Sequence, residues 1–328
     1  MSSLTSNDLI NCRKNVIEII STGELFLHQI NSAQRQFEYL MNEKEITKSS
    51  LENFNENVNF AIKLKKKYGY KFLHIVFPCK AIIRMNELRN VGIEVNPLYS
   101  IVHEQSHTIY PVDSMGKING SRLYDTHYSG VGQWAIIQRL LGELSLPYAT
   151  LIPKFEVTQM VGDLTKMLGG TAYESVQRFI KFDKLEHNIK CFTNKNAIAS
   201  NNGHIVYSIN SLAWRKERVL IFGDSFFLQC LNMISQIFEE VIFIRCSYVM
   251  EDVIASLSPD IVLSGQAERY LVNTPNCLTS APYFSRYFNN SFDGKKLDQN
   301  FINATNALFS PRGKGLHKHW RNSIVENG

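Results

Sequence analysis

The strongest structural signal in the sequence is the stretch Arg218-Val219-Leu220-Ile221-Phe222-Gly223-Asp224-Ser225. Four consecutive apolar residues are typical of a buried strand, and the glycine after them permits a tight turn. The following segment, Phe226 to Phe238, has a pattern that indicates a helix. A strand, a turn and a helix in this order predict a β-α unit with Ser225 at the carboxyl end of the strand.

The alternation of apolar strands and helices continues on both sides of this unit. Residues 241–244 and 260–263 predict strands, and residues 250–257 predict the helix between them. Upstream, a helix over residues 50–67 precedes an apolar strand at residues 72–77. This pattern predicts an α/β fold with a mostly parallel sheet that is covered on both faces, and such sheets bind ligands at their strand ends.

The amino-terminal part of the chain has a different pattern. The stretch from about Asn7 to Asn42 is helical in periodicity, so we expect an N-terminal helical region at residues 1–69 and the α/β region at residues 70–328. The apolar side chains of the helical region either fold onto the core or form an arm for oligomerisation or for an assembly partner. They include Val16, Ile19, Ile20, Leu25, Phe26 and Ile30.

The composition is that of an ordinary globular protein, with 328 residues of which 44% are hydrophobic and 20% charged. The 35 basic and 30 acidic side chains give a net charge of +5, which does not favour nucleic acid as a partner. The one dense basic cluster, Lys63 with Lys65–Lys67, ends a predicted helix, where cations suit the helix dipole.

Neither a secretory signal nor a membrane-spanning segment is predicted. The residues from Met1 to Asp8 lack a basic start followed by an apolar run, and no stretch approaches about 18 uninterrupted apolar residues. We therefore expect a cytoplasmic protein with reduced thiols and no transmembrane segment. None of the six cysteines belongs to a Cys-x-x-Cys pair, so no zinc or redox motif is present.

Ser225 is the candidate nucleophile. A serine at a strand-to-helix turn exposes its hydroxyl and places its N–H at a helix N-terminus, where it can help to hold an oxyanion. The alternative is that Ser225 only caps the helix. Its general base and the group that orients the base would be His127 and Asp125, because side chains two residues apart on an extended chain share a face. Residues 122–124 are expected to be a short strand leading to this pair; the alternative is a loop with a solvated Asp125 and a structural His127.

Other histidines are weaker candidates for the base. His317 and His319 lie near the C-terminus, but the residues three positions before them, Lys314 and Leu316, are not acidic. Two further histidines precede the Asp-x-His segment with a glutamate nearby, but they suggest no complete ligand set, so no metal site is predicted. These residues are His103, His107 and Glu104.

Several short segments resemble, in the same order, one known family. They are Ile75–Lys80, Tyr110–Asp113, Leu123–Tyr128, Gly132, Gly162–Leu164, Val219–Phe226, Pro259–Val262 and Glu268–Leu271. Together they cover roughly residues 70–275 and resemble the SGNH-like alginate O-acetyltransferases and their relatives from capsule and exopolysaccharide gene sets. The segment at residues 123–128 resembles the Asp-x-His-Trp signature of that family, with Tyr128 in place of the tryptophan.

The resemblance implies an SGNH-like, flavodoxin-like three-layer sandwich and a triad of Ser225, His127 and Asp125. It implies an enzyme of polysaccharide biosynthesis that moves an acetyl group from a donor to a glycan hydroxyl through an acyl-enzyme, without a cofactor. A carbohydrate acetylesterase with the same triad and a non-catalytic glycan-binding protein are the alternatives. Further candidates for holding the oxyanion or the substrate are Ser264, Gly265, Arg245, Tyr128 and Arg269. The aromatic segment Tyr283–Phe292 is a candidate glycan-facing loop.

Overall fold

The computed structural model describes two compact units, each assembled from separate parts of the sequence. The first unit contains Met1–Asn55, Ile75–Asp183 and Gln266–Thr274, and the second contains Glu56–His74, Lys184–Gly265 and Pro275–Gly328. The predicted boundary after residue 69 stays a prediction. Within these units the structure describes residues 8–28, 35–101, 107–118, 120–198, 201, 203–280, 298–310, 312–315, 317–319 and 321–322.

The β-α unit around Ser225 is confirmed. Strand β10 (Arg215–Gly223) leads into helix α8 (Ser225–Ile237), and strand β11 (Phe238–Arg245) follows it and pairs in parallel with β10. Helix α9 (Glu251–Leu257) then leads to β12 (Ile261–Ala267), which is parallel to β10 on its other side. The four apolar residues of β10 are fully buried, as a strand covered on both faces requires.

The other strands extend this sheet to seven, in the order β5-β4-β12-β10-β11-β9-β8. Strands β9 (Ile205–Asn210) and β8 (Ile189–Thr193) are antiparallel to their neighbours, while the centre of the sheet is parallel. Strands β4 (Lys71–Phe77) and β5 (Thr108–Ile109) are at the opposite edge. The predicted α/β class and the predicted strand at residues 72–77 are therefore confirmed.

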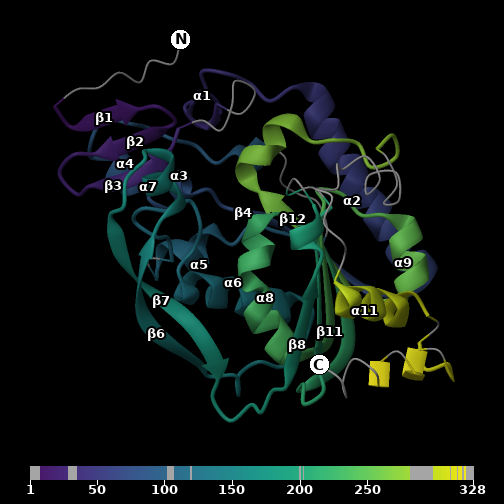
Figure 1. Cartoon of the computed structure of the whole chain (residues 1–328). Coiled ribbons are helices and arrows are strands. Elements are labelled where there is room, and N and C mark those ends of the chain that lie inside the picture. Colours follow the sequence, from purple (N-terminus) through teal and green to yellow (C-terminus); the bar gives the residue numbers. More distant parts are fainter. Residues whose placement is uncertain are drawn as a thin grey trace. The chain divides into compact units, whose positions relative to one another are not determined.

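The helix predicted over residues 7–42 is wrong for residues 10–27, which form strands. Strands β1 (Ile10–Arg13), β2 (Val16–Ile19) and β3 (Glu24–Leu27) form an antiparallel three-stranded sheet, drawn as purple arrows in Figure 1. Turns interrupt the apolar runs, with Gly23 at φ +68° between β2 and β3. β-branched residues in such short runs favour strands over helices.

Two helices follow the N-terminal sheet. Helix α1 (Gln36–Leu40) is short, and α2 (Lys48–Tyr68) confirms the helix predicted over residues 50–67. None of the helices among the described residues is both long and apolar enough to cross a membrane.

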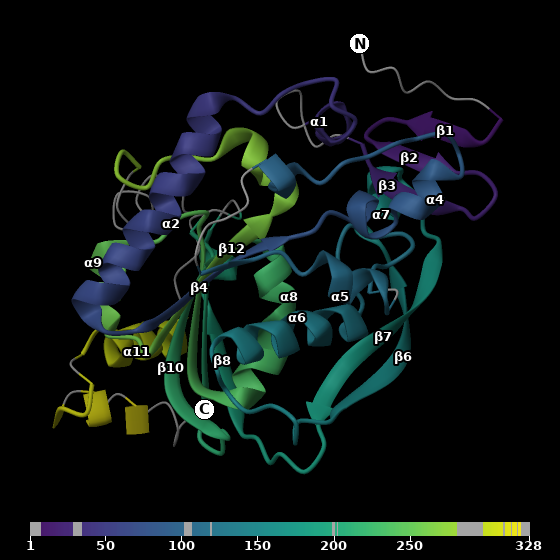
Figure 2. The same ribbon diagram turned by 180° about the vertical axis from the view of Figure 1, so that it is seen from behind.

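A long two-stranded ribbon of β6 (Pro153–Val161) and β7 (Tyr173–Phe182) is the second sheet of the first unit (Figure 1). Helix α6 (Gly130–Glu143) packs against β7, as Figure 2 also shows, and α7 (Asp163–Met167) connects the two strands. Ser129 caps α6, because its hydroxyl accepts a hydrogen bond from the N–H of Gly132.

The remaining elements are short helices. In the first unit they are α3 (Lys80–Ile83), α4 (Met85–Arg89), α5 (Val112–Gly116) and the 3₁₀ helices η1 (Leu98–Ile101) and η3 (Glu268–Asn273). In the second unit they are η2 (Lys195–Ala197) and α11 (Gln299–Phe309).

Two isoleucines of the N-terminal segment distinguish the observed strands from the predicted helix. Ile17 is fully buried in β2, whereas Ile20 is 52% exposed. We expect Ile17→Ala to lower the free energy of unfolding by about 2–5 kcal/mol, and Ile20→Ala by no more than about 0.5 kcal/mol. Urea unfolding of the two variants measures this difference. Equal losses would contradict the burial pattern of β2.

Candidate active site

The loop that carries Asp125 and His127 is held in a bent conformation. Ser121 and Tyr128 form an isolated antiparallel bridge, and the chain between them turns back on itself. The short strand predicted at residues 122–124 is therefore wrong. The N–H groups of residues 123 and 124 donate to the carboxylate of Glu174, at 2.7 and 3.3 Å, and not to a neighbouring strand.

The predicted contact between Asp125 and His127 is present. His127 Nδ1 lies 2.7 Å from Asp125 Oδ1, and the His127 N–H donates to the same oxygen at 2.9 Å. The other oxygen, Oδ2, faces Arg122 Nη1 at 2.8 Å and accepts from the N–H of Asp163 at 3.1 Å. Asp125 is 5% exposed, so these donors replace almost all of its water.

These contacts decide the charge of Asp125. Burial alone would raise the pKa of Asp125, but the hydrogen bonds from His127 and the charges of His127 and Arg122 outweigh it and hold the pKa well below its usual range. The ionised carboxylate accepts the Nδ1–H of His127. The ring is thereby oriented and Nε2 becomes the nitrogen for proton transfer, as a general base requires.

Asp163 is a residue of this site that our sequence analysis noted in a motif but did not assign. Its carboxylate accepts from the Thr126 N–H at 2.8 Å and the Thr126 hydroxyl at 2.5 Å, and its Oδ2 lies 3.5 Å from His127 Nδ1. Burial and the nearby charge of Asp125 raise the pKa of Asp163. The only signal for it in the sequence was the segment Gly162–Leu164, which resembles a Gly-Asp-Leu helix start of the family named above.

The close approach of the chain before α7 to the loop of Asp125 requires glycine at position 162. A Cβ atom at this position would lie 1.8 Å from the carbonyl oxygen of Tyr124, which is closer than any non-bonded contact. The Leu164 N–H donates to the same carbonyl at 3.2 Å. The backbone before α7 can therefore lie directly against the loop of Asp125 only because residue 162 is glycine.

Buried charges support the loop from its other side. Arg122 bridges Asp125 and Glu174, and the Lys80 ammonium donates to the carbonyls of Leu25 and Leu123 at 2.7 and 2.6 Å. Burial lowers the pKa of Lys80 to about 8, against the opposing charge of Glu24, whose Oε1 lies 3.3 Å away. Lys80 thereby links strand β3 to the loop of Asp125 and His127. In the sequence, the signal for this cluster was that Lys80 and Arg122 each stand next to a short apolar run.

Ser225 is the first residue of α8, and it is partly exposed. Asp224, not Ser225, is the N-cap, because its carboxylate accepts from the Phe226 N–H at 2.9 Å. The alternative role of Ser225 as the capping residue is thus taken by its neighbour. Gly223 makes the turn possible, since a Cβ there would lie 2.5 Å from the Phe227 ring. Ser225 belongs to the second unit, and the Asp125–His127 pair to the first.

Three further candidates lie in the second unit. Gly265 and Arg245 are both in register with Gly223, on either side of it, so all three stand at the carboxyl edge of the parallel strands. Ser264 is buried, and its hydroxyl lies 2.7 Å from His74 Nδ1. Burial lowers the pKa of His74 to about 3, so this histidine is neutral at neutral pH.

The candidates Tyr128 and Arg269 lie in the first unit. Tyr128 is 2% exposed and its hydroxyl donates to the Pro78 carbonyl at 2.7 Å, which is a structural contact. Arg269 follows Glu268 in η3 and stacks over the Tyr270 ring. Glu268 is fully buried and accepts from two backbone N–H groups and from the Tyr110 hydroxyl.

One of the remaining histidine candidates, His317, belongs to a buried cluster of charged residues. His317 lies in the second unit, where its Nε2 is 3.3 Å from Arg218 and 3.8 Å from Glu240 in a buried cluster. His103, Glu104 and the segment Tyr283–Phe292 lie outside the described residues.

Among the described residues, Asp125, His127 and Asp163 are the group whose ligand atoms lie close enough together, within 4.8 Å, to hold a metal ion. The carboxylate oxygens of Asp125 and Asp163 and the Nδ1 of His127 already form hydrogen bonds or ion pairs with neighbouring groups. Asp125 takes Arg122 and His127, and Asp163 takes both donors of Thr126. A guanidinium beside the site also opposes a cation. This chemistry favours proton transfer over metal binding.

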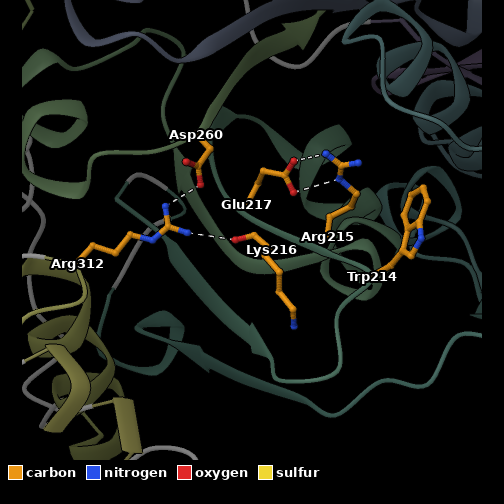
Figure 3. A pocket seen from close by; sticks show the side chains of 6 residues that line it. All are labelled: Trp214, Arg215, Lys216, Glu217, Asp260 and Arg312. Carbon is orange, nitrogen blue, oxygen red and sulfur yellow. Dashed lines mark hydrogen bonds and ion pairs between the residues drawn. The ribbon is translucent and has the colours of Figure 1, made fainter.

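A charged pocket of about 420 Å³ lies at the amino end of β10 (Figure 3). In it Arg312 pairs with Asp260 at 2.7 Å and Arg215 pairs with Glu217, while Trp214 stands at one side. The two arginines thus already have carboxylate partners. Ser225 follows the opposite, carboxyl end of the same strand, so this pocket is not the place of the predicted chemistry.

The fold defined by these units occurs in solved structures, although no protein-family model matches the chain and no curated relative was found. A DHHW family protein from Eubacterium siraeum has a TM-score of 0.56 and 12% identity, over 80% of this chain and 94% of that chain. Bacillus cereus PatB1 has a TM-score of 0.52 and 13% identity, over 85% of this chain and 100% of that chain. The O-acetyltransferase domain of Pseudomonas putida AlgJ has a TM-score of 0.49 and 15% identity, over 83% of this chain and 97% of that chain.

The depressed pKa of Asp125 predicts a pH-dependent contribution to stability. Because its folded pKa lies below the unfolded value of about 3.9, the ionised group stabilises the fold above that pH, and the contribution is lost as pH falls through the folded pKa. We expect Asp125→Asn to cost about 3 kcal/mol near neutral pH and progressively less towards about pH 2. Urea unfolding across this range measures the difference, and a cost independent of pH would contradict the assignment.

Proposed function

We propose that this protein transfers an acetyl group to a glycan hydroxyl through an acetyl-enzyme at Ser225, with His127 as the base and Asp125 as the carboxylate that orients it. The observation that carries the proposal is the 2.7 Å contact between His127 Nδ1 and the buried, ionised Asp125. Ser225, at a strand-to-helix turn with its capping role taken by Asp224, is the nucleophile that the chain offers to this base.

The reaction has two half-reactions. His127 Nε2 accepts the proton of the Ser225 hydroxyl while its oxygen attacks the acetyl carbonyl of the donor. The bond from the acetyl carbon to the leaving group then breaks, and the imidazolium returns its proton to that group. In the second half, His127 takes the proton of a glycan hydroxyl, the glycan oxygen attacks the acetyl-enzyme, and Ser225 leaves and recovers its proton.

The surroundings of His127 suit this role. When the His127 ring accepts a proton, its positive charge lies beside the carboxyl groups of Asp125 and Asp163. The nearby positive charge of the Arg122 guanidinium pairs with both Asp125 and Glu174. Carboxylates at such distances stabilise an imidazolium.

The oxyanion of each tetrahedral intermediate would be held by the Ser225 N–H, at the positive end of the 13-residue helix α8. Gly265 and Arg245 flank the same turn in register and are the candidates for a second donor in this proposal.

Two comparisons support the proposal from outside the chain. The ordered segments quoted above resemble the SGNH-like alginate O-acetyltransferases, which makes a three-layer SGNH-like catalytic region and a capsule or exopolysaccharide acceptor part of the proposal. PatB1 has also been solved with a sulfonyl adduct, at a TM-score of 0.53 and 12% identity over 80% of this chain and 97% of that chain. Sulfonyl groups attach to activated nucleophiles, which is the property assigned here to Ser225.

Replacing the nucleophile tests the proposal directly. We expect Ser225→Ala to lower p-nitrophenyl acetate hydrolysis by about 10³-fold or more, and to abolish the acetyl adduct in the mass spectrum, because no other group forms the acyl-enzyme. Ser235→Ala is the matched control, since Ser235 lies in the same helix and bonds to Ser208. An adduct that persists in Ser225→Ala would refute the assignment. Acetyl transfer to a sugar, as opposed to water alone, separates the transferase from an esterase.

Asp163 has a positioning role in this proposal, because it fixes the backbone of Thr126 between Asp125 and His127. We expect Asp163→Ala to lower kcat by about 10²-fold with little change in KM, since a small displacement of the base slows proton transfer. Asp163→Asn retains an acceptor for the Thr126 N–H and should fall between the wild type and Asp163→Ala. Steady-state kinetics measures this order; a change in KM alone would contradict it.

A further inference from the structure

Lys80 is a buried lysine to which the proposed reaction gives no role. Its Nζ donates to the carbonyl oxygens of Leu25 and Leu123 at 2.7 and 2.6 Å, and its charge pairs with Glu24 Oε1 at 3.3 Å. An ammonium has three N–H donors and no acceptor, so these three oxygens match what the group can offer. The side chain is therefore directed at the backbone of the loop that carries the candidate base, and not at solvent.

The backbone of Leu123 is held on both sides, whereas its side chain is 43% exposed. Its carbonyl accepts from the Lys80 ammonium at 2.6 Å and from the Leu25 N–H at 3.0 Å. Its own N–H donates to the Glu174 carboxylate at 2.7 Å. Because the exposed side chain adds little packing, these hydrogen bonds fix the peptide groups of residue 123. That residue stands two positions before Asp125, so its placement is passed on to the carboxylate that orients the base.

The short segment that contains Lys80 also holds the far end of this loop. The carbonyl of Pro78, two residues before Lys80, accepts from the Tyr128 hydroxyl at 2.7 Å, and Tyr128 directly follows His127. The catalytic pair therefore lies between two contacts, at residues 123 and 128, that are both made by residues 78–80. All of these residues belong to the first unit.

The charge of Lys80 is maintained at a cost. Burial lowers its pKa to about 8, the carboxylates of Glu24 in β3 and Glu174 in β7 favour the charged form, and the nearby Arg84 opposes it. A buried charge adds little net stability compared with an apolar side chain, and its best-attested effect is to select one arrangement. The N–H of Leu25 already joins β3 to the loop. The ammonium is thus not needed for the connection itself, which favours a role in setting its geometry.

We propose that Lys80 is a positioning residue of the acetyl transfer, which sets the place of Asp125, and thereby of the His127 ring, through the carbonyl of Leu123. The inference rests on the proposed function, because it takes His127 as the base. Lys80 acts through the loop and not on the substrate, so its loss misaligns proton transfer and leaves substrate binding intact.

Steady-state hydrolysis of p-nitrophenyl acetate tests this role. Lys80→Met keeps an unbranched side chain of similar length but removes the charge and the three donors. We expect kcat to fall about 10-fold with little change in KM, because a displaced base slows the chemical step and not binding. Lys154→Met is the matched control, since Lys154 lies in the same unit and pairs with Asp183 at 2.8 Å. A wild-type kcat for Lys80→Met, or an equal loss in the control, would overturn the proposal.

A double variant keeps the test valid where Lys80→Met alone does not fold. Adding Glu24→Gln removes both charges of the buried pair, which is tolerated better than the loss of one. Arg84, the other partner of Glu24, still has Glu87 at 3.1 Å. We expect the double variant to fold, as circular dichroism and urea unfolding measure, and to show the same loss of kcat. A folded double variant with wild-type kcat would refute the positioning role.

A spectroscopic measurement distinguishes failure of this inference from failure of the proposed function. The Nδ1–H of His127, bound to a carboxylate, gives a proton resonance far downfield, and its absence in His127→Gln assigns it. We expect a sharp resonance in the wild type and in Lys154→Met, and a broadened or missing one in Lys80→Met. This result supports the positioning role even where no acetyl-enzyme forms, in which case the catalytic proposal alone fails. An unchanged resonance in Lys80→Met, or none in the wild type, overturns the inference.

Discussion

The hydrogen bond between the Asp125 carboxylate and the His127 ring is the interaction on which the arrangement of the first unit depends. A carboxylate that is 5% exposed stays ionised only if donors and positive charge replace its water. Arg122, the His127 ring and the Asp163 N–H supply them. Each of these three groups is fixed in turn by contacts with other parts of the first unit.

The holding groups come from distant parts of the sequence. Arg122 is shared with Glu174, and Lys80 joins the carbonyl of Leu25 in the N-terminal sheet to that of Leu123 in the loop of Asp125 and His127. Removing one partner of such a buried set leaves an uncompensated charge, which is costly. The N-terminal strands thus support the loop of Asp125 and His127, and they belong to the same unit as that loop.

The second unit contributes a different kind of constraint, made by the backbone. Parallel pairing places Gly223 between Arg245 and Gly265, so that the turn before α8 stands at the edge where three strands end. Asp224 caps the helix, which leaves the Ser225 side chain outside the capping interaction. The position of this turn follows from the strand order and from Gly223, where a Cβ would lie 2.5 Å from the Phe227 ring.

By itself, the sequence determined what local patterns control. The succession from β10 to β12, helix α2 and the contact of Asp125 with His127 could be predicted, because apolar periodicity and a two-residue spacing act over short distances. Short apolar runs separated by turns are ambiguous, so residues 10–27 were mistaken for helix. Only the tertiary structure decided the roles of Asp163, Arg122 and Lys80, because buried charges find their partners between segments that lie far apart in the chain.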